Sequence, residues 1–166
     1  RRCVEELEEA GFPFFAGGQT TAPFDLIADY YRGSKGAMLD MFRCPDKLLR
    51  VMEKVRVLFA REVLEGAQGK WGSHVFIPLH WGLDGFMSED QFKTFFWPQL
   101  QDMMLAFIDA GLVPYVFWEG DCGTRLDIIS DIPPGKAIYK FERTDLFEAK
   151  KVLGDVVCIQ GSVPAS

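Results

Sequence analysis

The stretch HVFIPLHWGLDGFMSEDQFKTFFWPQLQDMMLAFIDAGLVPYVFW, residues 74–118, decides the fold class. Its two ends, residues 74–79 and 112–118, are short apolar runs rich in β-branched and aromatic side chains, as is typical of buried strands. Between them, Ser88 is followed by Glu, Asp and Gln, a pattern typical of a helix start, and we expect the helix to run to Gly111. Strands that are apolar throughout and joined by a helix predict parallel pairing, with both faces of the sheet covered.

The same alternation continues on both sides of this stretch. Further buried strands are predicted at residues 12–18, 137–141 and 156–160. Helices are predicted at residues 2–10, 23–33, 36–42, 45–66, 123–132 and 144–154. Thr144 is the expected N-cap of the last one. The fold class is therefore α/β, and both doubly wound sheets and (β/α)8 barrels share this rhythm.

Composition and charge exclude several classes of protein. Of the 166 residues, 48% are hydrophobic and 25% are charged, so the chain can bury enough surface to fold, which excludes disorder. The formal net charge of −6 argues against a nucleic-acid partner, because phosphate binding needs clustered Lys and Arg. No run of about 18 apolar residues indicates a membrane-spanning helix. The sequence also has no phosphate-binding loop, dinucleotide-binding motif or serine elbow, which argues against nucleotide-dependent chemistry and serine hydrolysis.

The four cysteines are scattered along the chain at Cys3, Cys44, Cys122 and Cys158. No secretory signal precedes them, so a disulfide scaffold is disfavoured and a cytoplasmic location is expected. Cys158 lies inside an apolar run and is expected to be a core residue.

In parallel α/β folds, functional residues gather where the strands end. His80 follows the first strand of the quoted stretch. The second strand is followed by Glu119, Asp121 and Cys122. A thiolate, two carboxylates and a histidine from the neighbouring strand are suitable Zn²⁺ ligands. Other roles remain open, because Asp121 could cap the next helix, Cys122 could be a small buried residue, and His80 could be an acid–base group or only hydrogen-bonded.

Four stretches, in order along nearly the whole chain, carry a family resemblance. Residues 22–35 match an APF/W-x-L helix followed by glycine, and residues 44–49 match an x-P-(D/E)-x-L-L helix start. Residues 88–98 match S-x-x-x-F-x-x-F-x-x-P. Residues 156–163 match v-x-l-x-G-N-v/l, with Ser162 in place of the usual asparagine. Together they resemble the uroporphyrinogen decarboxylase superfamily, which contains the decarboxylases and the corrinoid- or coenzyme-M-dependent methyltransferases.

The resemblance implies a (β/α)8 barrel of about twice this length, and therefore a partial TIM barrel here. Residues 1–166 would be the central part of a single barrel domain, truncated at both ends. The start at Arg1 without a methionine, and the end shortly after a predicted strand, agree with this expectation.

The resemblance also implies which residues line the substrate mouth. Asp29 lies where the decarboxylases carry a tyrosine that positions the tetrapyrrole, and Tyr30 is next to it. This departure argues against porphyrinogen decarboxylation. Asp29, Tyr30 and Asp84 are the expected substrate-binding residues.

The methyltransferases of the superfamily bind zinc through a histidine and a cysteine after a strand, and here the resemblance implies an acidic variant of that site. Cys122 fits the ligand cysteine, and Glu119 or Asp121 replaces the histidine. The expected zinc ligands are Glu119, Cys122 and His80. Asp121 and His80 are the expected catalytic residues.

The function that the resemblance favours is a methyltransferase that moves a methyl group between a small substrate and a corrinoid. A separate corrinoid protein is the expected partner, because the chain has no Asp-x-His-x-x-Gly motif for binding such a cofactor itself. Uroporphyrinogen decarboxylation is the alternative, and an inactive barrel fragment is a third. Neither a nucleic acid nor a membrane is an expected partner.

Overall fold

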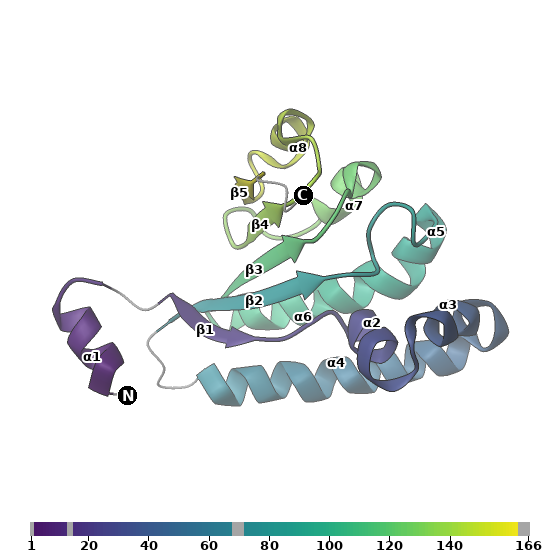
Figure 1. Cartoon of the computed structure of the whole chain (residues 1–166), viewed down its shortest axis with the longest axis horizontal. Coiled ribbons are helices and arrows are strands. Elements are labelled where there is room, and N and C mark those ends of the chain that lie inside the picture. The colour runs from purple at the N-terminus through teal and green to yellow at the C-terminus, as the bar shows by residue number, and fades with distance from the viewer. Residues whose placement is uncertain (1, 13–14, 68–71, 163–166) are drawn as a thin grey trace.

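The protein is described by a computed structural model that covers residues 2–12, 15–67 and 72–162. Its centre is a sheet of five parallel strands in sequential order, β1-β2-β3-β4-β5. The strands are β1 (Ala16–Gln19), β2 (His74–Leu79), β3 (Val113–Trp118), β4 (Ile138–Phe141) and β5 (Cys158–Gly161). Figure 1 shows this sheet as open and twisted, with helices between successive strands. The architecture is α/β and agrees with part of a (β/α)8 barrel, as predicted.

The helices occupy the connections between strands. They are α1 (Arg2–Glu9), α2 (Pro23–Leu26), the π-helical turn η1 (Ile27–Tyr31), α3 (Ser34–Arg43), α4 (Pro45–Ala67), α5 (Glu89–Gln91), the π-helical turn η2 (Phe92–Phe96), α6 (Trp97–Asp109), the 3-10 turn η3 (Gly123–Arg125), α7 (Leu126–Ile129) and α8 (Leu146–Leu153). The long helices α4 and α6 pack on each other and on β1 and β3, and they lie on the same side of the sheet in Figure 1. Within the described ranges, none of these helices has the length and apolarity needed to cross a membrane.

The two faces of the sheet differ in how they are covered. The face turned to the helices carries the fully buried side chains Val75, Ile77, Leu79, Val116 and Trp118. On the opposite face, Phe76, Tyr115 and Phe117 are half-buried, and Phe76 contacts the other two rings. The Lys140 ammonium lies 4.3 Å from the Phe117 ring centre. The expected cover on both faces is therefore seen on one face only in the described part of the chain. The uncovered face is the one that lines the interior when such a sheet curves into a barrel.

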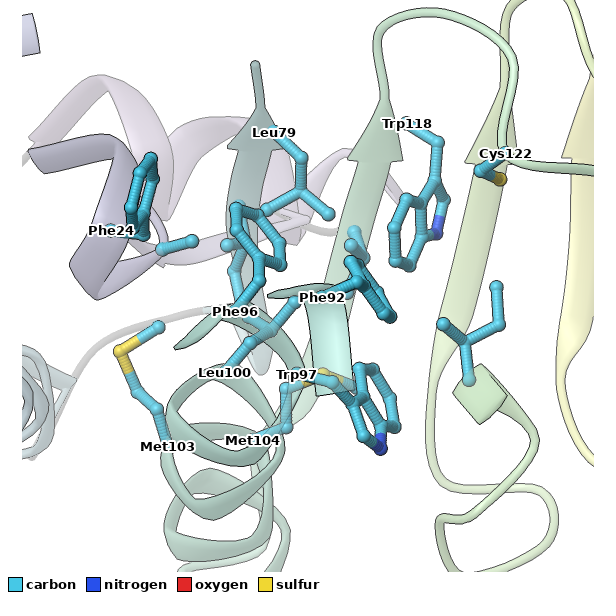
Figure 2. Close-up of a cluster of buried hydrophobic side chains, with 14 of the residues drawn as sticks. Phe24, Leu79, Phe92, Phe96, Trp97, Leu100, Met103, Met104, Trp118 and Cys122 are labelled. Atoms are coloured by element: carbon cyan, nitrogen blue, oxygen red, sulfur yellow. The ribbon is translucent and has the colours of Figure 1, made fainter. Parts of the chain in front are cut away.

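The main core lies between β2, β3 and the helical connection between them. The helix starts at Ser88 as predicted, with a capping box. The Ser88 hydroxyl accepts the Gln91 backbone N–H, and the Gln91 side chain accepts the Ser88 backbone N–H. The helix then passes through the π-helical turn η2, just before Pro98, which has no N–H to donate to the preceding turn. Figure 2 shows Phe92 next to Trp118, the last residue of β3, with Phe96 and Trp97 in the same buried cluster. The predicted strand–helix–strand unit is therefore confirmed.

The predicted strand at residues 12–18 is wrong in its first part. β1 starts only at Ala16, while Phe12 and Phe15 are 68% and 50% exposed; residues 13–14 lie outside the described part of the chain. The Phe15 ring stacks on His74, with 3.8 Å between ring centres, instead of entering the core.

Two local predictions near the carboxyl-terminal strands are also wrong. Asp145, not Thr144, caps α8, because its carboxylate accepts the backbone N–H groups of the first helical turn. The Thr144 hydroxyl instead accepts the N–H of Cys122. Cys158 is exposed rather than buried, because β5 is the last strand of the described sheet and its side chain lies on the uncovered face.

Candidate active site

Three ionisable residues follow the carboxyl ends of the central strands and lie opposite one another in the register of the sheet. The last residues of β2, β3 and β4 lie opposite one another in the register. His80, Glu119 and Glu142 are the residues that follow each strand. The Glu119 N–H donates to the Leu79 carbonyl at 3.4 Å, and the Glu142 N–H donates to the Trp118 carbonyl at 3.2 Å, so the ladder continues one step past the strands. In parallel barrels this end of the sheet carries the active site.

Asp25 anchors the backbone of the segment after β2. Its Oδ2 accepts the His80 N–H at 2.8 Å and its Oδ1 accepts the Trp81 N–H at 3.1 Å. The side chain is 0% exposed, although it lies in α2, the first helix after β1. Burial raises the pKa of Asp25 to about 7, although its two backbone donors and the nearby His80 oppose the shift.

Asp29, one turn further along, holds the side chains of the same two residues. Its Oδ2 lies 2.6 Å from His80 Nδ1, and its Oδ1 accepts the Trp81 indole N–H at 2.6 Å. On the other side of the imidazole, His80 Nε2 lies 3.6 Å from Glu119 Oε2. The π-helical turn η1 contains Asp29, and such turns widen a helix locally, frequently at functional sites.

The electrostatics of this cluster favour a protonated His80. Burial by itself would lower the pKa of His80, but the hydrogen bond to Asp29 and the charges of Asp25, Asp29 and Glu119 outweigh it and raise the pKa. The carboxylates around His80 therefore favour its protonated form, in which the imidazole can donate a proton.

A pocket of about 520 Å³ opens beside His80. Its lining includes Tyr30, which is 74% exposed, and Thr20, whose buried hydroxyl has no hydrogen-bond partner among the described residues. Tyr30 and His80 therefore line the same cavity, and Asp29 contacts His80. These are three of the residues that the sequence singled out.

Asp84 lies in a different set of contacts. Its carboxylate accepts the Thr124 hydroxyl at 2.7 Å and the Thr124 N–H at 3.0 Å. Its Oδ1 also lies 3.3 Å from Nε of Arg125, an ion pair without hydrogen-bond alignment. Arg125 is buried, donates to the Met87 carbonyl at 2.6 Å and lies 5.0 Å from the Phe92 ring centre. Asp84 is thus bound to protein groups on both of its oxygens.

Asp121 is exposed and takes part in a turn. Its Oδ1 accepts the Gly123 N–H at 2.9 Å, and its backbone carbonyl accepts the Asp84 N–H at 2.8 Å. The carboxylate contact forms an Asx turn ahead of η3, whose N-cap is Cys122, so Asp121 is not the helix cap considered from the sequence.

Cys122 is fully buried and faces Thr144, with 3.4 Å between Sγ and Oγ1. Figure 2 shows it beside the core side chains near Trp118. Burial raises the pKa of the thiol to about 12. In the described part of the chain, no three His, Cys, Asp or Glu side chains gather closely enough to hold a metal ion. The expected ligands Glu119, Cys122 and His80 therefore do not fit a zinc site as they are placed.

The buried Cys122 thiol should resist alkylation in the native protein. A pKa about three units above the ordinary thiol value means about a thousandfold less thiolate at pH 8, and the thiolate is the nucleophile. With iodoacetamide at pH 8, the exposed Cys3 and Cys158 should react first, and Cys122 should react only when urea unfolds the chain. Mass spectrometry of tryptic peptides measures this order, and early labelling of Cys122 would contradict the buried placement.

Four residues of this region were not singled out from the sequence as site residues. They are Asp25, Trp81, Arg125 and Glu142. Glu142 follows a strand, so the same rule that identified His80 could have selected it. Asp25 and Asp29 are four residues apart on one helical segment, a spacing that places both on one face. That spacing was the available signal for Asp25.

The parallel α/β sheet, with a histidine and carboxylates at the carboxyl ends of its strands, defines part of a (β/α)8-type barrel with a candidate active site at its mouth. The chain belongs to the uroporphyrinogen decarboxylase family, whose model (uroporphyrinogen decarboxylase, URO-D) matches residues 3–166. No curated protein matches the chain.

Among solved structures, the fold is similar to that of a methyltransferase from Methanosarcina mazei, with a TM-score of 0.65 and 16% sequence identity. The match covers 88% of this chain and 42% of that one, so the chain spans less than half the length of that methyltransferase. At this identity the similarity establishes the fold alone.

Proposed function

We propose that the chain is the central part of a cytoplasmic methyltransferase barrel that moves a methyl group between a small substrate and the corrinoid of a partner protein. The observation that carries the proposal is the His80 imidazole, which lies between Asp29 and Glu119 at the carboxyl end of the sheet and lines a pocket. Membership of the uroporphyrinogen decarboxylase family and the fold shared with a methyltransferase support it.

His80 is the acid–base residue of this proposal. Nδ1 is held by Asp29, so Nε2 is the nitrogen left to exchange a proton with the leaving or attacking group of the substrate. Glu119, 3.6 Å from Nε2, stabilises the imidazolium before the proton leaves. The corrinoid, when bound, supplies the centre that accepts or donates the methyl group.

The proposal assigns none of these steps to zinc. Of the three expected ligands, His80 and Glu119 lie side by side, whereas the Cys122 thiol is buried against Thr144. Metal analysis of the full-length protein, as wild type and as His80→Ala and Cys122→Ala variants, tests whether these residues hold zinc in solution.

The charges at the mouth disfavour the decarboxylase alternative. Uroporphyrinogen is a polycarboxylate, and its recognition needs cationic side chains. The described residues that follow β2 and β3 supply three carboxylates, Asp84, Glu119 and Asp121, beside His80, and Arg125 is buried against Asp84. An anionic substrate would therefore meet repulsion on this side of the mouth.

The proposal predicts that His80→Ala slows methyl transfer by about a hundredfold or more, because proton transfer by a positioned side chain contributes at least that factor. The assay follows demethylation of methylcobalamin by the full-length protein with a panel of small thiols as acceptors. His74→Gln is the matched control, since His74 is the other histidine of the chain and contacts Phe15. Turnover of uroporphyrinogen without methyl transfer would replace the proposal by the decarboxylase alternative.

A further inference from the structure

Two consecutive residues, His80 and Trp81, are held by two aspartates that lie one helical turn apart. Asp25 accepts both of their backbone N–H groups, and Asp29 contacts both of their side-chain nitrogens. The partners are more than 50 residues apart in the sequence. Backbone and side chains of one short segment are therefore fixed from a single helical face.

The contacts of Asp29 determine how the imidazole is presented. The Nδ1 distance to Asp29 is 2.6 Å, whereas the Nε2 distance to Glu119 is 3.6 Å, beyond a normal hydrogen bond. The nitrogen that carries the proton in a neutral histidine is set by the stronger hydrogen bond. Asp29 therefore favours a proton on Nδ1 and leaves the Nε2 lone pair directed to the mouth.

Trp81 fixes the carboxylate itself. A carboxylate with one hydrogen bond can rotate about its terminal torsion, which is broad. The indole N–H occupies the second oxygen of Asp29 at 2.6 Å, and the indole is in turn packed edge-on against Phe86, with 5.0 Å between ring centres. With both oxygens occupied, Asp29 has no oxygen free of protein contacts to offer a substrate.

We propose that Asp25, Asp29 and Trp81 are positioning residues that hold His80 in the Nδ1–H tautomer with Nε2 facing the barrel mouth. The part played by Nε2 in catalysis rests on the proposed function. The arrangement itself does not, because it can be measured without substrate. It gives Asp29 a different role from the substrate contact expected from the sequence.

The test is side-chain nitrogen NMR of the full-length protein labelled with ¹⁵N-histidine. His80→Gln removes the His80 signals and so assigns them, and His74→Gln assigns those of the other histidine of this chain. At a pH high enough to make the imidazole neutral, wild-type His80 should show the Nδ1–H tautomer. Asp29→Ala should move it towards Nε2–H, and Glu119→Gln should leave it unchanged.

A second variant keeps the test valid if Asp29→Ala fails to fold. Trp81→Phe retains the aromatic packing and removes only the N–H donor. It should speed exchange of the His80 Nδ1 proton with water by about tenfold, the factor that one lost hydrogen bond of ordinary strength corresponds to. Phe86→Leu, which leaves the N–H in place, is the matched control.

The proposal is overturned if wild-type His80 is the Nε2–H tautomer, or if neither Asp29→Ala nor Trp81→Phe changes the signal. Its failure is distinguishable from failure of the proposed function. The expected tautomer together with an undiminished methyl-transfer rate in His80→Ala would retain the positioning and reject the catalytic role.

Discussion

Replacing Asp84 by alanine should destabilise the protein by about 3–5 kcal/mol, because it removes the nearest counter-charge of a buried cation. The Arg125 side chain is 3% exposed and lies 3.3 Å from Asp84. The Met87 carbonyl and the Phe92 ring do not neutralise its charge, and the exposed Glu89 carboxylate interacts with it only electrostatically, without an ion-pair contact. Urea unfolding followed by tryptophan fluorescence measures the loss in the free energy of unfolding.

A double variant separates the charge effect from the loss of the other Asp84 contacts. Asp84→Ala combined with Arg125→Met removes both charges and keeps an apolar side chain in the buried site, so it should recover part of the stability lost in Asp84→Ala. The hydrogen bonds to Thr124 are lost in both variants, so their contribution to the free energy of unfolding is not recovered in the double variant. Glu53→Ala, an exposed carboxylate in the middle of α4, is the control and should have little effect. A double variant as unstable as the single one would show that the buried charge is not the cause.

The parts of the fold that depend on local signals could be predicted from the sequence. The apolar runs at 74–79 and 112–118 and the capping box at Ser88 act through neighbouring residues, and the structure has them where expected. The start of β1 could not be predicted in this way. A Cβ on Gly17 would lie 2.3 Å from the Gly72 carbonyl oxygen, so this strand needs a close approach of two backbones that are far apart in the sequence.

In the candidate site, too, some residues could be predicted from local signals and others only from contacts that the fold creates. The rule that functional residues follow parallel strands identified His80 and Glu119, which lie side by side. Asp25 was missed because it lies among apolar residues in the first turn of a helix, where a carboxylate has a local explanation. Its actual partners are the backbone N–H groups after β2, and only the fold brings them together. For Cys122, spacing alone did not separate the ligand from the buried residue, and the structure has it buried.

Two replacements of Trp118, by alanine and by phenylalanine, should separate the effect on stability of losing buried volume from that of losing the indole N–H. Trp118→Ala should destabilise the protein by about 3–5 kcal/mol, the usual cost of removing a large buried aromatic side chain. Trp118 is fully buried at the end of β3 and contacts Tyr139 edge-on, with 5.7 Å between ring centres. Figure 2 shows it facing Phe92 and Leu79, so the cavity would open in the main core beneath the site.

Trp118→Phe should cost far less, about 1 kcal/mol, because the indole N–H that it removes makes no hydrogen bond with the described residues. An unpaired buried donor carries a desolvation cost, and its removal offsets part of the lost packing. The exposed Phe147→Ala in α8 is the control for a loss of aromatic volume without burial, and it should change stability by less than about 0.5 kcal/mol. If Trp118→Phe were as destabilising as Trp118→Ala, the indole N–H would have a partner in the folded protein, to be sought on the helix-covered face of the sheet, where Trp118 lies.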